Sequence, residues 1–272
     1  MTAIETADRL ADQIPDGSSV LIAPDYSGCA MAVVAALIRR GAKDLRLIGA
    51  PQMGLQAELL VAANCVASIE TAAMSLGEFG TAPAFEAARK AGEITVIEST
   101  CPAIHAGLQA AERGVPFAPV RGILGSDLIE LRDDWQVIDN PLPPHDPILL
   151  VPAINPDVAL FHSPLGDGDG NVWIGVRREL MSMAHAAKRS VVSVDQRQAA
   201  SLLHDQWQAP GTIPALYIDA LGEIAGGGRP LGSPGQYAPD PAFIHRYKQA
   251  FKAGTHRAVI EQWISDAAPA NA

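Results

Sequence analysis

The alternation of short apolar runs with helix-like segments that end at glycine is the feature that most constrains this chain. In its first half, apolar runs at 19–23, 45–49, 65–69 and 94–98 alternate with helix-like segments at 29–40, 82–91 and 104–113. A glycine follows each of these helix-like segments, as suits the left-handed residue that often ends a helix. Strands separated by helices are typical of parallel sheets with crossover connections. The pattern therefore predicts an α/β fold, a doubly wound and mostly parallel sheet with helices on both faces.

The second half continues this pattern beyond a proline-rich segment. Residues 139–144 hold the densest prolines of the chain and are either a domain linker or a loop at the edge of the sheet. Further apolar runs lie at 148–152, 158–162 and 191–194, and further helix-like segments at 3–14, 178–187, 242–252 and 256–264. A chain of 272 residues is long enough to bury a large core, and we expect a single domain over residues 1–272.

Composition excludes several classes of protein. Hydrophobic residues make up 48% of the chain and charged residues 18%, which is far from the composition of a disordered chain. The net charge is −10, and no run of Lys and Arg is present. Because a nucleic-acid surface needs clustered basic side chains, we expect no nucleic acid among the partners.

Neither export nor a membrane segment is predicted. The first 14 residues carry four charged side chains among apolar ones, unlike a signal peptide, and no run of about 18 apolar residues occurs. The three cysteines, Cys29, Cys65 and Cys101, are widely spaced and favour neither a disulfide framework nor a metal site. We therefore expect a cytoplasmic protein that does not bind a membrane or a metal ion.

The centre of the chain resembles a known family. Four segments follow one another there: 138–142 (IDNPL), 148–158 (ILLVPAINPDV), 159–162 (ALFH) and 169–172 (DGNV). This order resembles the A (alpha) subunit of family I coenzyme A transferases of the glutaconate type. That family has an Asp-Asn-Pro-Phe turn, a Pro-x-Val-Asp-Val-Ala strand that ends near a histidine, and a Gly-Asn turn. Residues 107–117 (GLQAAERGVPF) are similar to a helix and the start of a strand in the same family, so the resemblance covers most of the chain.

The resemblance implies an enzyme for acyl-CoA thioesters that works only with a B-type subunit, as an α2β2 heterotetramer. In the family's transferases a glutamate of the B subunit forms the glutamyl-CoA thioester. This chain is then expected to form one wall of a shared site, into which coenzyme A enters as the substrate thioester. Some relatives instead hydrolyse ring-containing steroid-derived CoA esters or decarboxylate a methylglutaconyl-CoA. Three functions stay open: CoA transfer, hydrolysis or C–C cleavage or decarboxylation on the same scaffold, and a non-catalytic structural subunit.

One departure from the family bears on this choice. The family's alpha subunit normally carries, after its first strand, a Gly-Gly-Phe loop that lets backbone amides approach the thioester. The corresponding stretch here is 23–29 (APDYSGC), in which Gly28 is the only glycine. The missing glycines favour a reaction other than transfer, whereas the overall similarity favours transfer. We include Gly28 among the candidate residues for binding coenzyme A.

Residues 98–105 (ESTCPAIH) form the most suggestive group of polar side chains. Glu98 ends a predicted strand, and Thr100 or Cys101 suits the N-cap of a helix that has proline in its first turn. Cys101 then lies at a helix N-terminus, where a thiolate is favoured, and His105 follows one turn later on the same face. Comparison with the steroid-ring hydrolases also suggests an acidic residue of their alpha subunit near Glu98 or Cys101. We predict that Glu98, Cys101 and His105 are catalytic; the alternative is a capped helix with a small buried cysteine.

A glycine-rich loop supplies the other candidates for binding coenzyme A. Gly227 and Gly228 can bring backbone amides near a phosphate, and Arg229 can supply a positive charge. Elsewhere, His162 is followed by Ser163 and Asp167, residue types that occur in hydrolase triads. The strand–turn–helix elbow of such hydrolases is missing there, which argues against a triad. Residues 167–171 (DGDGN) resemble half of a calcium-binding loop, but the glutamate that closes such a loop is absent, so a plain Gly-Asn turn is the favoured interpretation.

Overall fold

The computed structural model of this protein describes residues 5–267, which form eight helices and fourteen strands. The helices are α1 (Ala7–Asp12), α2 (Met31–Arg40), α3 (Leu55–Ala62), α4 (Pro83–Ala91), α5 (Cys101–Glu112), α6 (Arg178–Ala186), α7 (Pro241–Lys252) and α8 (His256–Asp266). The strands of the main sheet are β1 (Ser19–Ile22), β2 (Leu45–Gly49), β4 (Val66–Thr71), β6 (Thr95–Glu98), β10 (Val158–Asp167), β11 (Val172–Trp173), β12 (Arg189–Gln198), β13 (Thr212–Ile213) and β14 (Ala220–Glu223). The strands of two smaller sheets are β3 (Gln52–Met53), β5 (Ala73–Met74), β7 (Phe117–Val120), β8 (Gln136–Asp139) and β9 (Pro147–Pro152).

The main sheet is parallel except at one edge. Its parallel part runs in the order β14-β12-β10-β1-β2-β4-β6, and the short strands β11 and β13 add antiparallel pairs beside the far end of β10. From β1 the chain winds outward through β2 and β4 to β6; from β10 it winds the opposite way through β12 to β14. The doubly wound sheet predicted from the sequence is confirmed, and its strand order reverses between β1 and β10.

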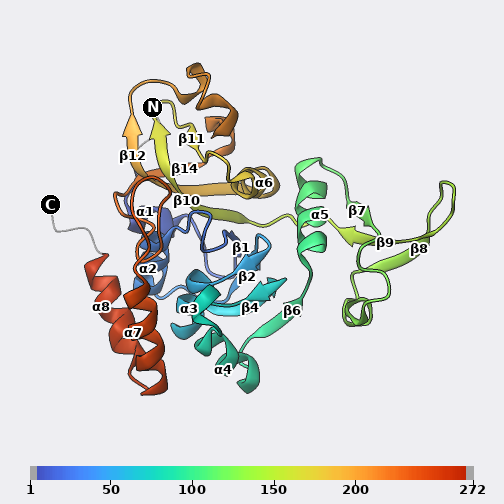
Figure 1. The fold of residues 1–272 in the computed structure, drawn as a ribbon, viewed down its shortest axis with the longest axis horizontal. Helices are drawn as coiled ribbons and strands as arrows, with labels where there is room; N and C mark the ends of the chain where they lie inside the picture. Colours follow the sequence, from blue (N-terminus) through green and yellow to red (C-terminus); the bar gives the residue numbers. More distant parts are fainter. Residues whose placement is uncertain (1–4, 268–272) are drawn as a thin grey trace.

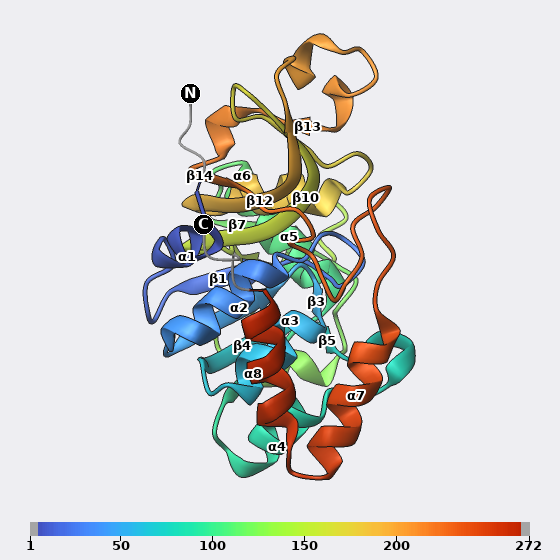
Figure 2. The ribbon, with the colours of Figure 1, turned by 90° about the vertical axis from the view of Figure 1, so that its left-hand side faces the viewer.

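Helices cover both faces of this sheet (Figures 1 and 2). On one face, α1, α2 and α3 bury the largest apolar cluster, which includes Leu10, Leu37 and Leu59, and α8 packs on α2. On the other face, α5 and α6 pack on Phe161 and Val192 of β10 and β12. No helix within residues 5–267 is long and apolar enough to cross a membrane.

A three-stranded antiparallel sheet of β7, β9 and β8 stands apart from the main sheet, beyond α5 (Figure 1). The proline-rich segment 139–144 begins at the last residue of β8 and continues into the loop that leads to β9, so it lies within this small sheet and is not a domain linker. Arg132 ties the small sheet to the main one: its Nη1 donates to Glu70 Oε1 at 2.9 Å and to the carbonyl of Glu98 at 3.2 Å. The same guanidinium pairs with Asp134 and lies 4.7 Å above the ring of Trp135.

Most predicted elements are confirmed, and one helix was missed. Residues 3 and 4 of the predicted N-terminal helix lie outside the described residues, and α1 begins at Ala7 behind the N-cap Thr6. The missed helix is α3, in which Leu55 through Val61 are all buried. A helix that is buried on all sides, its polar residues Gln56 and Glu58 included, lacks the exposed polar stripe by which amphipathic helices are recognised. β10 and β12 also run about five residues beyond the apolar runs that predicted them, because polar residues continue both strands.

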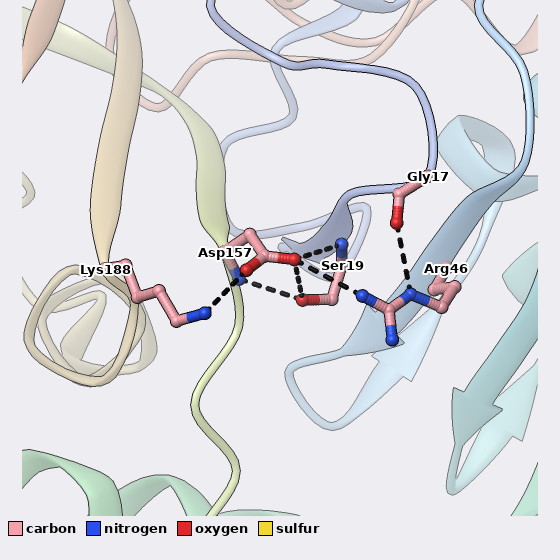
Figure 3. Close-up of polar contacts among 5 residues, drawn as sticks. All are labelled: Gly17, Ser19, Arg46, Asp157 and Lys188. Atoms are coloured by element: carbon pink, nitrogen blue, oxygen red, sulfur yellow. Dashed lines mark hydrogen bonds and ion pairs between the residues drawn. The ribbon is translucent and has the colours of Figure 1, made fainter.

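At the amino-terminal ends of the central strands, Asp157 joins β1 to β10 (Figure 3). Its Oδ2 accepts hydrogen bonds from the backbone N–H of Ser19 at 2.9 Å and from its hydroxyl at 2.7 Å. The Ser19 hydroxyl accepts in return from the backbone N–H of Asp157 at 2.9 Å. Lys188 Nζ lies 2.8 Å from Oδ1, and Arg46 Nη2 lies 3.4 Å from Oδ2. The hydrogen bonds from Lys188 and Ser19 hold the pKa of Asp157 well below its usual range.

Beyond the carboxyl end of β1, the loop that follows this strand approaches the backbone of β10 closely. The N–H of His162 donates to the carbonyl of Gly28 at 2.9 Å. Gly28 has a φ of +111°, and a Cβ at this position would lie only 2.1 Å from the carbonyl oxygen of His162. Only glycine fits here, because both the backbone conformation and the contact exclude a side chain.

We expect Asp157→Asn to lower the free energy of unfolding by about 1–2 kcal/mol at pH 7, because the charge-assisted hydrogen bonds that connect β1 and β10 are weakened. The pKa of Asp157 is lowered on folding, so its stabilisation is complete above the usual Asp pKa of about 4 and is lost as the pH falls below it. Urea unfolding at pH 7 and at pH 3.5 measures both effects. Asp8→Asn, which removes an exposed pair with Arg39, is the control and should cost about 0.5 kcal/mol or less. A gap between wild type and Asp157→Asn that widens in acid would contradict this assignment.

We expect Gly28→Ala to destabilise the chain by about 3 kcal/mol or more, because the new methyl group collides with the backbone of His162. Gly17→Ala is the matched control: Gly17 has a φ of +75° but nothing within 4 Å of the added Cβ, so only the backbone strain of about 1 kcal/mol remains. Thermal and urea unfolding of the three proteins give the comparison. Equal losses in the two variants would show that the close approach to His162 has no energetic weight.

Candidate active site

A cavity of about 920 Å³ opens at the carboxyl ends of the parallel strands, next to the point where the strand order reverses. Open α/β sheets bind their ligands in this crevice. The walls come from the loops after β1, β2 and β4 and from the long loop before α7, namely residues 25–26, 52–54, 75–79 and 231–239, with Arg177 and Ile244. A cavity of this volume is large enough for a drug-sized ligand or the acyl end of a thioester.

The loop after β1, residues 23–29, forms the inner wall of the cavity and is held at several points. Ser27 donates a hydrogen bond to Glu179 of α6, and the guanidinium of Arg177 lies 5.4 Å from the ring centre of Tyr26. Gly28 holds the end of the loop against the backbone of His162. The loop is therefore fixed, and its residues Asp25 and Tyr26 line the cavity.

Asp25 combines a cavity position with an unusual environment. The backbone N–H of Leu55, at the start of α3, lies 3.0 Å from both carboxylate oxygens of Asp25. Gly54 makes this approach possible, because a Cβ there would lie 2.1 Å from Oδ2 of Asp25. The buried thiol of Cys29 is 3.9 Å from Oδ1. Burial raises the pKa of Asp25 to about 6, against the opposing effects of the hydrogen bonds from Leu55 and Cys29.

Beneath the other wall of the cavity lies a buried network around His162. Its Nε2 is 3.1 Å from Asp195 Oδ2, and its Nδ1 is 2.8 Å from the hydroxyl of Ser193. Asp195 also accepts from the Ser233 hydroxyl at 2.5 Å and from the backbone N–H of Gly226 at 2.8 Å. Burial opposes the ionisation of Asp195, yet these hydrogen bonds keep its pKa below the usual value. The network fixes the loop from Gly226 to Ser233, whose far end lines the cavity.

Of the residues Gly227, Gly228 and Arg229, which are predicted to bind coenzyme A, the two glycines pack against this histidine. A Cβ on Gly227 would lie 3.0 Å from His162 Cε1, and one on Gly228 would lie 3.3 Å from Cδ2. The N–H groups of these three residues donate within the chain, to Ile224 O at 2.9 Å, to the Tyr237 hydroxyl at 2.9 Å and to Gly226 O at 2.9 Å. The guanidinium of Arg229 lies 4.4 Å from the centre of the Tyr237 ring, beside a second cavity of about 410 Å³. Close packing against His162 is sufficient to explain why residues 227 and 228 are glycines. Binding of coenzyme A by this loop stays a prediction.

Glu98, Cys101 and His105, predicted to be catalytic, lie at the opposite edge of the sheet. Glu98 ends the edge strand β6 and is exposed, Cys101 opens α5 and is exposed, and His105 is half-buried. The N-cap of this helix is Thr100, which accepts from the backbone N–H of Ala103 at 3.2 Å. From β6 to β10 there are four strand spacings, about 19 Å. The structure therefore does not join the group at Glu98 with the loop at Gly227, and none of the three side chains lines the large cavity.

The turn after His162 is structural. Asp167 is fully buried and accepts from the N–H groups of Asp169 and Asn171, each at 2.9 Å, and from Leu202 N at 2.8 Å. Ser163 donates to a carbonyl oxygen of β11. The favoured Gly-Asn turn is confirmed, and His162 pairs with Asp195, 33 residues further along the chain.

Sequence reasoning missed Asp25 and Asp195. Asp25 closely follows the apolar run 19–23, and this position after a strand was the signal available for it. Asp195 stands inside the longer strand β12, where a polar residue signals nothing by itself. Within residues 5–267, no group of three or more His, Cys, Asp or Glu side chains is arranged to hold a metal ion.

Comparison with known proteins adds the family. A sequence profile described as "Coenzyme A transferase" matches residues 4–221. The "Cholesterol ring-cleaving hydrolase IpdA subunit" of Rhodococcus jostii is 30% identical over 239 residues, which span 82% of this chain and 77% of that protein. The A subunit of the 3-oxoadipate CoA-transferase of Pseudomonas knackmussii is 27% identical, and the match covers 98% of this chain and 92% of that protein. An uncharacterised protein of Archaeoglobus fulgidus is 32% identical, and the match spans 80% of this chain but only about half, 48%, of that protein.

A solved structure agrees with these sequence matches. A variant of the decarboxylase AibA/AibB superposes with a TM-score of 0.85 at 26% identity, and the match covers 97% of this chain and 100% of the other chain. The relatives thus include a transferase, a hydrolase and a decarboxylase on one scaffold. With a family match over most of its length and a parallel sheet of the same architecture, the chain belongs to the coenzyme A transferase family, as a chain of the alpha-subunit type.

Proposed function

We propose that this chain is the alpha subunit of a cytoplasmic heteromeric enzyme that acts on acyl-CoA thioesters together with a B-type subunit, as an α2β2 heterotetramer. The observation that carries the proposal is the cavity of about 920 Å³ at the carboxyl ends of the strands, next to the reversal of strand order. The loop 23–29 forms its inner wall, and this loop is the counterpart of the segment that approaches the thioester in family transferases. The cavity is therefore where we expect the acyl end of the substrate.

Two observations support a B-type partner. The names of the hydrolase and transferase relatives describe each of them as a subunit. At the mouth of the cavity, Tyr26 is exposed, and Val176 beside Arg177 is 86% exposed. Two more large apolar side chains, Trp207 and Leu216, are more than 80% exposed. Exposed apolar side chains of this size are typical of surfaces that another protein covers.

Hydrolysis or C–C cleavage is the reaction that we propose for this site, with acyl transfer or decarboxylation as the alternative. In the loop 23–29, the family's pair of glycines is replaced by residues that include Asp25 and Tyr26, both of which line the cavity. A carboxylate with a pKa near 6 can exchange protons at neutral pH, which hydrolysis needs. The similarity to a 3-oxoadipate CoA-transferase over 98% of the chain supports transfer. A 3-oxo or dicarboxylic acyl group is the substrate class that we expect.

Purified alone, the chain should show no turnover of CoA esters, because the residues that complete the site belong to the B subunit. Co-expression with the neighbouring reading frame should give a complex that converts acetoacetyl-CoA or glutaryl-CoA. Mass spectrometry of the products in ¹⁸O-water separates the reactions: hydrolysis or C–C cleavage places one ¹⁸O in the released acid, and transfer to added acetate places none. Full activity of the isolated chain would rule out the need for a partner. A folded complex that converts no CoA ester would indicate the non-catalytic subunit.

Glu98, Cys101 and His105 are proposed to meet the B subunit in a second part of the shared site, since all three are at least partly exposed at one sheet edge. If so, Glu98→Gln or Cys101→Ala should lower kcat of the complex by about 10²-fold with an unchanged melting temperature. Glu93→Gln, an exposed carboxylate just before the same strand, is the control. Near-normal turnover of both variants, in a correctly assembled complex, would leave this group with only its role of starting α5.

A further inference from the structure

Glu58 and Asp25 each accept hydrogen bonds from the backbone at the start of a neighbouring helix, but only Asp25 lines the cavity. Glu58 accepts from the backbone N–H groups of Ala84 at 2.7 Å and Phe85 at 3.0 Å, at the start of α4, and from the Tyr247 hydroxyl at 2.7 Å. Its side chain is completely buried. Burial raises the pKa of Glu58 against these three hydrogen bonds. Glu58 therefore caps the start of α4 and, with three hydrogen bonds and no exposure to solvent, has a structural role.

Asp25 makes the corresponding contact with α3 but stays open to the cavity. One backbone N–H, from Leu55, serves both of its oxygens, and within residues 5–267 the thiol of Cys29, at 3.9 Å, is its only side-chain donor. A carboxylate has about four acceptor positions, so part of this capacity is left unused in a residue that lines the cavity. Gly54 removes the side chain that would otherwise fill the space beside the carboxylate. The contact with α3 fixes the orientation of Asp25 but does not occupy all hydrogen-bond acceptor positions of its carboxylate.

We propose that Asp25 is a catalytic residue of this enzyme, the base that takes a proton from a water molecule as the water attacks the acyl-CoA substrate in the cavity. The proposal rests on the proposed function in acyl-CoA chemistry, and it assigns the proton transfer to this subunit. The titratable or charged side chains that share the cavity with Asp25 are Tyr26, Glu78, Arg177 and Tyr237, and Cys29 lies behind it.

The proton transfers balance without another co-reactant. The water oxygen forms a bond to a carbonyl carbon of the substrate while one water proton passes to a carboxylate oxygen of Asp25. The C–C or C–S bond at that carbon then breaks, and the protonated Asp25 returns the proton to the leaving carbon or sulfur. One water is consumed and no electrons are exchanged with another molecule. A general base in this position typically contributes about 10²–10⁴-fold to the rate.

The environment of Asp25 suits this cycle at neutral pH. Burial raises its pKa to about 6, so that the carboxylate is ionised at pH 7 and yet holds a proton far more readily than an ordinary Asp. The pKa is higher in the folded than in the unfolded chain. The ionised form therefore costs stability, and this cost sets in as the pH rises from about 4 through about 6.

The test is Asp25→Asn in the complex with the B subunit, with acetoacetyl-CoA and glutaryl-CoA as probes. The amide oxygen of Asn can still accept from Leu55, so that the complex should assemble and the melting temperature at pH 7.5 should not fall. We expect kcat to drop by about 10²-fold or more with KM changed less than about threefold. The rise of wild-type kcat with pH through about 6 should disappear in the variant. The wild-type melting temperature, measured relative to the variant, should also decline between about pH 4 and pH 6.

Glu58→Gln is the matched control, because Glu58 is a second carboxylate at the start of a helix and its side chain is completely buried. It should lower the melting temperature and leave kcat and its pH profile unchanged. If Asp25→Asn turns over like wild type with the same pH profile, Asp25 is only a helix cap and the proposal is overturned while the proposed function stands. If the wild-type complex itself converts no CoA ester, the proposed function fails and takes this role of Asp25 with it.

Discussion

The parallel pairing of β1 with β10 joins the two halves of the main sheet, and the positions of all other elements follow from it. β1 has only four residues, with Val20, Leu21 and Ile22 opposite Val158, Ala159 and Leu160. At one end of this pair the carboxylate of Asp157 bridges the strands, and at the other end the backbone of Gly28 accepts from His162. So short a pair gains little from its ladder alone, and polar contacts beyond both ends fix its register. Because the chain winds away from this pair in both directions, the cavity opens beside it.

The polar groups near the cavity are of two kinds: those that are buried and hydrogen-bonded to one another, and those with hydrogen-bonding capacity left over. His162, Ser193 and Asp195 satisfy one another inside the protein, as buried polar groups must, and leave nothing for a ligand. Their effect on the cavity is indirect, since they hold the loop that carries Tyr237. Asp25 is different because it lines the cavity and one backbone N–H serves both of its oxygens, which leaves acceptor positions unused. Hydrogen-bond saturation thus separates the groups that shape the site from the group that is free to react.

Glycines in this chain have two structural roles, packing inside the protein and making room beside the cavity, and a sequence motif does not distinguish them. Gly28, Gly227 and Gly228 stand where a family resemblance or a glycine-rich loop suggests ligand binding, yet each of them packs against His162 so closely that a Cβ would come within 3.3 Å of it. Gly54, which belongs to no motif, is the glycine that lets a carboxylate approach a helix start beside the cavity. The physical requirement is the same in both cases, a close approach of other atoms to the backbone. Only the neighbouring atoms tell which of them serves a ligand.

The sequence by itself determined the architecture. Its apolar runs and its helices that end at glycine are local patterns, and the folded chain forms strands and helices at these same places. The sequence also determined the family, since the order of segments between residues 138 and 172 survives as β8, β9, β10 and the turn at Asp167. It missed α3, which is buried on all sides and has no amphipathic stripe. The tertiary structure alone decided the candidate site: Asp25 meets Leu55, 30 residues away, and His162 meets Asp195, 33 residues away. Such pairs form only when crossover connections bring the ends of separate strands to one edge of the sheet, and no local pattern records that meeting.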